Sequence, residues 1–233
     1  MPLSQPDQQD RRLERGQRTR GRLVEAGLKL FALKGFEAVS IRELAAEGEA
    51  NAAAISFHFG GKAGLYAAVV DHVTAHLAGV YRQALEPAAS LTGDVPPDEA
   101  ASAVRAMVAR LIEALLTTPR SRWTSLLLQR EFIDPTRAFE RIFSQALEPA
   151  LDAFARAVEA AGGATRGSLD NKALAFGIFV LASAYSRSRA TFLKWSGRLE
   201  YAPGDTRELG RIVSDFVLGG LAGSTRPGTP HTL

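Results

Sequence analysis

The stretch from Ser40 to Lys62 brings together short side chains that can contact base edges and cationic groups that can contact phosphates. Alanine methyl groups can pack against thymine methyls, whereas hydroxyl and guanidinium groups can form hydrogen bonds with base edges. Apolar residues recur between them at helical spacing, so one face of each short helix would be buried and the other exposed. The exposed set of the second helix would comprise Ala52, Ala53, Ser56, Phe57 and His58.

Two short helices must position these side chains. Ser40 is expected to cap the first helix, because its hydroxyl and the Glu43 carboxylate have the spacing of a capping box. Gly48 and its neighbours interrupt that helix, and Asn51 can cap a second helix over 52–57. Two short helices joined by a glycine-containing turn favour a helix-turn-helix, whose second helix would fit a major groove about 12 Å wide. A plain helical hairpin within a bundle would give the same pattern.

Residues 23–62 resemble the DNA-binding domain of the TetR family of bacterial regulators, through the segments LVEAGLKLFALKGFEAVSIRELA and NAAAISFHFGGKAGLY. The resemblance implies base contacts from Ser40, Arg42, Ala52, Ala53 and Ser56, and phosphate contacts from Asn51, His58 and Lys62. Lys62 also begins a helix, where backbone N–H groups favour an anion.

Two positions depart from the family pattern. Glu49 occupies a position where the family usually has glycine, and the turn there is expected to need a positive φ. Gly48 lies one position earlier, so a shifted turn is the alternative. Phe57 replaces a tyrosine whose hydroxyl tends to reach a phosphate in similar proteins, which implies one contact fewer. Glu47 and Glu49 also add negative charge, which opposes DNA binding.

The composition is that of a globular protein, with 46% hydrophobic and 23% charged residues in a chain of 233. The absence of cysteine excludes disulfides and thiolate metal sites, and it fits a cytoplasmic protein. No apolar run reaches the ~18–20 residues that a membrane span requires, and no signal peptide is visible. The net charge of +3 permits nucleic acid binding without arguing for it.

An all-α fold of about nine helices is expected, because β-branched residues are scarce and strand-like alternation is absent. The expected organisation is a disordered basic arm over 1–17, a helix-turn-helix domain over 18–66, a helical ligand-binding and dimerisation domain over 67–222 and a disordered tail over 223–233. Arginines cluster between residues 11 and 22, either as a solvated tail or as an arm that contacts phosphates or the minor groove.

The body of the chain contains aromatic residues that could line a ligand cavity or fill a plain core. The candidates for ligand contact are Trp123, Phe132, Phe139, Phe143 and Phe176. Residues 123–151 also resemble the C-terminal domain of the CecR-like branch of the TetR family. That resemblance implies an unknown small-molecule effector, which an aromatic and aliphatic lining would make apolar or amphipathic.

The last two expected helices, over 171–189 and 206–221, favour a homodimer interface. The first contains the run ALAFGIFVLASAY, and a helix that is apolar all round must be buried all round. The interface residues would be Phe179, Leu209, Ile212, Val213, Phe216, Val217 and Gly220. An internal helix pair in a monomer is the alternative.

No catalytic constellation emerges, so we expect neither an enzyme nor a cofactor. His72 and His76 have a zinc-binding spacing, but no third ligand is evident and no metal is expected. The predicted function is a ligand-responsive repressor, released from a near-palindromic double-stranded operator by a small molecule. The alternative is a helical small-molecule-binding protein, or an unusual enzyme, that has lost specific DNA binding.

Overall fold

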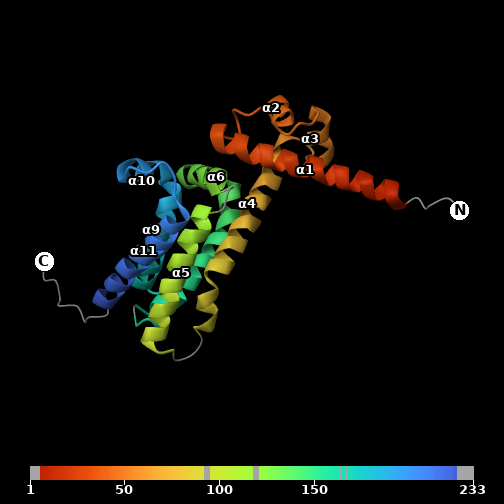
Figure 1. Cartoon of the computed structure of the whole chain (residues 1–233). Helices are drawn as coiled ribbons and strands as arrows, with labels where there is room; N and C mark the ends of the chain where they lie inside the picture. The colour runs from red at the N-terminus through yellow and green to blue at the C-terminus, as the bar shows by residue number, and fades with distance from the viewer. Residues whose placement is uncertain (1–5, 92–94, 118–120, 163, 166, 225–233) are drawn as a thin grey trace. The chain divides into compact units, whose positions relative to one another are not determined.

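The computed structural model describes residues 6–91, 95–117, 121–162, 164–165 and 167–224. Regular structure in these residues is helical, and no strand occurs among them, which confirms the predicted all-α fold (Figure 1). Contacts divide the chain into two compact units, residues 1–74 with 123–142 and residues 75–122 with 143–233. Among the described helices, none has the length and apolar character needed to cross a membrane.

The first unit contains the expected helix-turn-helix. Its helices are α1 (Pro6–Lys34), α2 (Ile41–Glu47), α3 (Ala52–Phe59), the first part of α4 (Lys62–Ala84), most of α6 (Ser121–Ile133) and α7 (Arg137–Ile142). Its core forms because each of the first four helices supplies apolar residues at helical spacing. Leu23, Phe31, Leu44, Ile55 and Leu65 are fully buried.

The first helix differs from the expectation. It begins at Pro6, whereas the predicted start lay near Arg18 with a disordered arm before it. Residues 6–22 have no apolar stripe, but arginine, glutamine and glutamate are good helix formers. Proline is also favoured at the first helical position. The core-bound half of α1 therefore continues as helix towards the N-terminus.

Arg130 of α6 caps the C-terminal end of α1. Its Nε donates to the Ala32 carbonyl at 2.8 Å, and its Nη2 donates to the Leu33 carbonyl at 2.7 Å. Gly35 ends α1 with a φ of +81°, and a Cβ at this position would lie 3.2 Å from Arg130 Nη1. The guanidinium thus satisfies carbonyls that a helix end leaves without partners.

The neighbouring Glu131 is buried and joins α4 to the start of α7. Its carboxylate accepts a hydrogen bond from the Tyr66 hydroxyl at 2.7 Å and from the Thr136 hydroxyl at 2.8 Å. Burial, and then the bond to Glu131, raise the pKa of Tyr66. The Tyr66 ring packs edge-on against Phe31 of α1 at 5.1 Å. Residues 123–142, which were predicted to lie in the body, therefore belong to the same compact unit as the helix-turn-helix.

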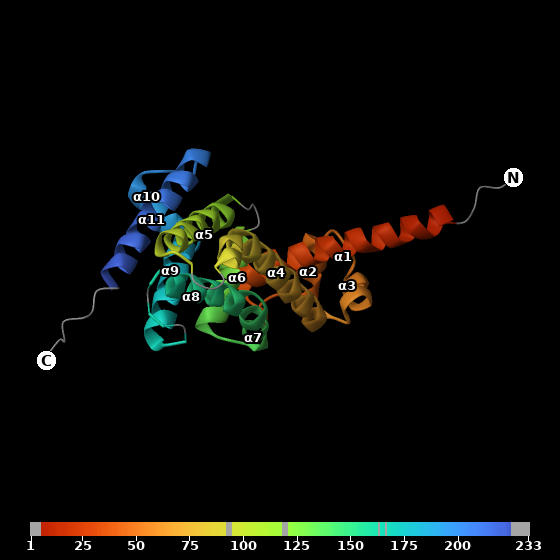
Figure 2. The same cartoon turned by 90° about the horizontal axis from the view of Figure 1, so that it is seen from below.

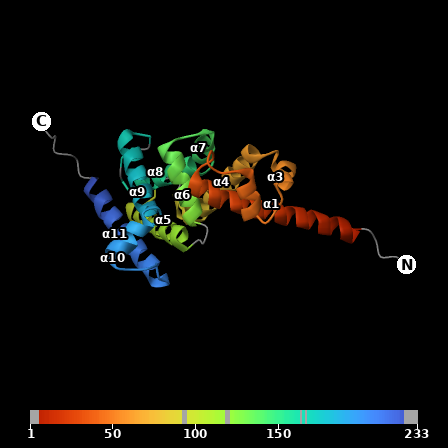
Figure 3. The same ribbon diagram turned by 90° about the horizontal axis from the view of Figure 1, so that it is seen from above.

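The second unit is built around α5. Its helices are the rest of α4, α5 (Pro97–Thr117), α8 (Glu148–Ala160), α9 (Leu169–Arg187), α10 (Arg189–Ser196) and α11 (Pro203–Ser224), with a 3₁₀ turn at Glu86–Ser90 and a π-helical turn at Phe143–Leu147. Helix α5 packs against α8, α9 and α11, and Figure 3 shows α5 beside α11. Met107, Leu111 and Phe154 are fully buried at its centre. The π-helical turn directly precedes α8, and Pro149 lies in the first turn of that helix.

Candidate nucleic-acid interface

Ser40 caps α2 as expected. Its hydroxyl accepts from the Glu43 N–H at 3.2 Å, and its own N–H donates to Glu43 Oε2 at 2.9 Å, which completes a capping box. Lys34 Nζ lies 2.7 Å from Glu43 Oε1. The hydrogen bond from Lys34, followed by those from Ser40, lowers the pKa of Glu43 to about 2. This carboxylate is therefore ionised at neutral pH and holds the start of α2.

Helix α3 is short and capped at both ends. Asn51 Oδ1 accepts from the Ala54 N–H at 2.8 Å, and Gly60 ends the helix in the left-handed conformation with a φ of +73°. Ile55 is the buried anchor of this helix. The other face is open to solvent, with Ala52, Ala53, Ser56 and Phe57 all exposed and the Phe57 ring 84% exposed.

The remaining predicted contacts lie at the margins of this face. Arg42 is exposed on α2, whereas His58 is half-buried beside the rings of Phe57 and Phe59. Lys62 begins α4. Its Nζ donates a hydrogen bond to the Glu37 carbonyl at 3.2 Å, and the same Nζ lies 4.5 Å from the centre of the Phe36 ring. All nine predicted residues thus lie on α2 and its cap, on α3 and its cap, or at the start of α4; their contacts with DNA stay predictions.

The turn between α2 and α3 passes through Glu49. This residue has a φ of +48°, so the position that is usually glycine in the family does require a left-handed backbone, and the turn is not shifted. Gly48 has an ordinary φ of −83° and is needed for a different reason. A Cβ there would lie 2.8 Å from Leu23 Cδ2.

Cations of α1 neutralise the acidic residues near this turn. Arg22 Nη1 lies 2.9 Å from Glu49 Oε2, and Lys29 Nζ lies 2.6 Å from Glu47 Oε1. Both pairs are exposed, so each contributes no more than about 1 kcal/mol to stability. Their main effect is to offset the negative charge that would oppose a phosphate backbone.

Sequence profiles identify the family. Residues 23–69 match the bacterial regulatory proteins of the tetR family. Residues 100–224, more than half of the chain, match the C-terminal domain of the HTH-type transcriptional dual regulator CecR. The chain belongs to the TetR family, in its CecR-like branch. It is therefore a ligand-responsive, DNA-binding transcriptional regulator.

Individual relatives agree with this assignment. The TetR-family chain is 28% identical to CecR of Shigella flexneri over 218 residues, which cover 89% of this chain and 95% of that protein. A TetR-family regulator from Streptomyces coelicolor, SCO4454, has a similar fold, with a TM-score of 0.61, 18% identity and coverage of 90% and 97% of the two chains. The fatty acid degradation regulator FadR of Bacillus halodurans has a TM-score of 0.59, 13% identity and coverage of 87% and 96%. CecR is named as a transcriptional dual regulator.

The predicted ligand-contacting residues do not form one set. Phe132 and Phe139 lie edge-to-face at 6.1 Å in the first unit, where Trp123 is half-buried. Phe143 is half-buried at the start of the π-helical turn in the second unit. Phe176 is 56% exposed on α9, and its contact with a ligand stays a prediction.

The predicted dimer residues divide into two faces of α11, together with one residue of α9. Leu209, Val213 and Val217 are buried within the chain, in the helix that packs on α5, and Phe179 is buried against Tyr81 and Phe154. Within the described chain these four are core residues, and their contact with a second subunit stays a prediction. Ile212 is 48% exposed and Phe216 73% exposed, and Gly220 is also exposed. Two separate i, i+4 series, 209–213–217 and 212–216–220, were a signal that these residues divide between two faces of the helix.

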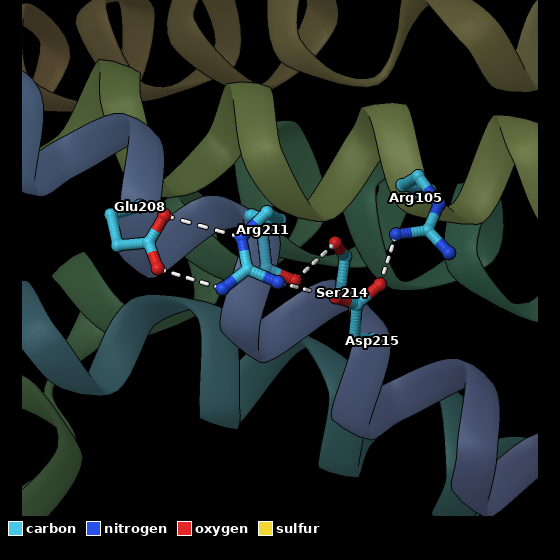
Figure 4. A network of polar contacts seen from close by, with 5 residues as sticks. All are labelled: Arg105, Glu208, Arg211, Ser214 and Asp215. Atoms are coloured by element: carbon cyan, nitrogen blue, oxygen red, sulfur yellow. Dashed lines mark hydrogen bonds and ion pairs between the residues drawn. The ribbon is translucent and has the colours of Figure 1, made fainter.

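A polar network lies along α11 beside this exposed series (Figure 4). Arg211 contacts Glu208 Oε1 at 2.7 Å and Asp215 Oδ2 at 3.1 Å, and Asp215 also pairs with Arg105 of α5. The hydrogen bond from Arg105 is the first cause of the lowered pKa of Asp215. The network links α11 to α5, and the Ile212 and Phe216 side chains of α11 remain exposed beside it.

No metal site is found in the part of the chain that the structure describes. There, no group of three or more histidine or acidic residues could hold an ion. His72 and His76 are both half-buried on α4 and form no such group.

Proposed function

We propose that this regulator is a homodimeric repressor that binds a near-palindromic DNA site through α3. The observation that carries the proposal is the geometry of α3. A single buried side chain, Ile55, anchors it, and both ends are capped. Its exposed face combines the small or polar side chains of Ala52, Ala53 and Ser56 with the Phe57 ring, and such a helix can enter a major groove. A two-fold dimer would place two such helices in successive major grooves, about 34–36 Å apart.

The exposed face of α3 favours a mixed mode of recognition. Ala52 and Ala53 can contact thymine methyl groups but donate no hydrogen bond. Ser56 has a hydroxyl, and Arg42 of α2 could add a bidentate contact. Specificity would therefore depend partly on the shape and deformability of the DNA.

A dimer interface on α9 and α11 is supported by exposed apolar side chains next to small residues. Phe176, Ile212 and Phe216 are large and exposed. Gly177, Gly219 and Gly220 are exposed as well, and a Cβ at any of them would meet no atom within 4 Å. Such a surface allows close approach of a second pair of helices, and clustered exposed apolar residues mark interaction sites.

The effector would be an apolar or amphipathic molecule that binds in the helical body. It would release DNA by preferring the conformation that does not bind DNA, and coupling of this kind is typically about 1–3 kcal/mol. Trp123, Phe132 and Phe139, which all belong to the first unit, are the aromatic side chains that could contact this molecule.

The test is selection of bound duplexes from a random DNA pool with the full-length protein at near-physiological salt. A near-palindromic motif is expected. The matched control is Ala53→Asp, which puts a negative charge on the exposed face of α3 and should abolish enrichment without altering the helical content. Absence of any enrichment with the wild-type chain would refute the proposal and favour a ligand-binding protein without specific DNA binding.

A further inference from the structure

The N-terminal part of α1 projects beyond the rest of the DNA-binding helices. Residues 6–22, here called the α1 extension, lie outside the three-helix core, and the views agree that this end of α1 passes α2 and α3 (Figures 1, 2 and 3). The side chains of residues 11–15 are all exposed, including Leu13 at 59%. Burial in the core therefore does not explain this part of the helix.

Four arginines share one side of the extension. Arg11, Arg15, Arg18 and Arg22 are spaced by four, three and four residues, which places them on a single helical face. Arg15, Arg18 and Arg22 line a shallow depression of about 580 Å³, together with Thr19, Gly21 and one acidic residue, Glu25. Like charges at this spacing destabilise an isolated helix by about 0.2–0.5 kcal/mol per pair. An anionic partner would reverse that effect.

The extension is held in a fixed direction relative to α3. Gly16 packs close to His58, so that a Cβ at Gly16 would lie 3.9 Å from His58 Cε1. The Arg20 guanidinium lies 5.3 Å from the centre of the Phe59 ring. Two residues at the C-terminal end of α3 therefore support the side of α1 that carries Gly16 and Arg20.

The arginine face turns towards the side where α3 begins. Arg22, at one end of the face, contacts Glu49 in the turn directly before α3. Within the described residues, Arg15 and Arg18 have neither an ion pair nor a hydrogen bond, and both are exposed. These cations are thus continuous with the proposed DNA-binding surface.

We propose that Arg11, Arg15 and Arg18 bind backbone phosphates of the duplex outside the half-site that α3 contacts. In this role the α1 extension acts as a rigid helix and not as a flexible arm. The inference rests on the proposed function, which is DNA binding through α3. The face from Arg11 to Arg22 is about 16 Å long at 1.5 Å per residue. A duplex of that length presents about nine backbone charges, at one per ~1.7 Å. The contacts are to phosphates, so they add affinity without sequence preference.

The salt dependence of binding gives the expected size of the effect. Each phosphate contact contributes about 0.9 to the slope of log K against log salt. Three contacts in each protomer of a dimer would account for about a 10³-fold loss of affinity between 50 and 200 mM salt.

The first experiment compares the duplex enriched from the random pool in two forms, trimmed at the outer edges of its half-sites or extended by random flanks. The wild-type protein should bind the extended form more tightly. The triple variant Arg11→Gln, Arg15→Gln, Arg18→Gln should bind both forms equally and show a smaller salt slope. The matched control removes three exposed cations elsewhere in the chain. It combines Arg82→Gln in α4, Lys172→Gln in α9 and Arg207→Gln in α11, and it should keep the preference for the extended duplex.

The variant Gln17→Pro separates a rigid helix from a flexible arm. Proline in a helix interior breaks the helix, yet this change keeps every arginine. It should lose the preference for flanked duplex as completely as the triple variant. If Gln17→Pro keeps the preference, the rigid helix is refuted; if wild type shows no preference while still binding its motif, the phosphate contacts are refuted. Failure to enrich any motif would instead count against the proposed function.

Discussion

Arg22 and Glu49 bind each other across α1 and the turn that precedes the recognition helix, with Arg22 Nη1 2.9 Å from Glu49 Oε2 and Arg22 Nη2 3.3 Å from the Glu49 carbonyl. The backbone of Glu49 is in the left-handed conformation, with a φ of +48°. An exposed ion pair therefore secures a residue whose backbone conformation suits glycine better.

Glu49→Gly should stabilise the protein and tighten DNA binding. A left-handed conformation costs a non-glycine residue about 1–2 kcal/mol, whereas the exposed ion pair contributes about 0–1 kcal/mol. We expect the free energy of unfolding to rise by about 0.5–1 kcal/mol in urea denaturation, and Arg22 to become available to a phosphate. Glu49→Ala keeps the backbone strain and loses the pair, so it should be destabilising; equal effects of the two changes would contradict this account.

Lys62→Ala should weaken binding to all duplexes by a similar factor and lower the salt slope by about one for each protomer of the dimer. The physical reason is that a lysine at the start of α4 adds its charge to helix N–H groups that favour an anion. Titration of selected and unrelated duplexes over a salt series measures both quantities. Lys194→Ala, an exposed lysine of α10, is the control and should change neither. Loss of binding at one sequence alone would disprove a phosphate role.

Glu43 should make stability depend on pH in the acid range. Its pKa is lowered from 4.5 to about 2, chiefly by the hydrogen bond from Lys34 and then by those from Ser40. A lowered pKa in the folded state stabilises the fold above the unfolded pKa, and this contribution is lost as pH falls from about 4.5 towards about 2. Denaturant unfolding across that range measures it. Glu43→Gln retains a capping side chain but should reduce the dependence, and Lys34→Gln should reduce it as well; an unchanged dependence in both variants would disprove the assignment.

Phe216→Arg should convert the dimer to monomers. Phe216 is 73% exposed within the chain, so the change should leave the fold of each protomer intact. In a dimer interface, however, it would bury a charge without a partner, which is costly. Sedimentation velocity measures the outcome, with Ile133→Arg as the control at an exposed apolar position of α6. An intact Phe216→Arg dimer would place the interface elsewhere.

The local features of the DNA-binding helices could be predicted from the sequence, because they depend on short-range chemistry. Ser40 with Glu43, and Asn51 with its helix, follow capping rules that involve neighbours three residues away. The positive φ at Glu49 could be anticipated from the family's glycine.

Features that depend on tertiary contacts could not be predicted. The pairing of Arg130 with the carbonyls of α1 joins residues almost a hundred positions apart. The helical state of residues 6–17 could not be recognised either, because they lack the apolar periodicity that marks a packed helix. The core and surface series of α11 are both apolar, so composition alone does not distinguish Val213 from Phe216.

The attachment of α6 to the DNA-binding helices also matters for engineering chimeric regulators. A chimera that joins only residues 1–74 to another sensor domain would leave behind Arg130 and Glu131. The Ala32 and Leu33 carbonyls and the Tyr66 hydroxyl would then lose their partners. The transferable module is discontinuous in sequence, and a working fusion should carry residues 123–142 together with the N-terminal segment.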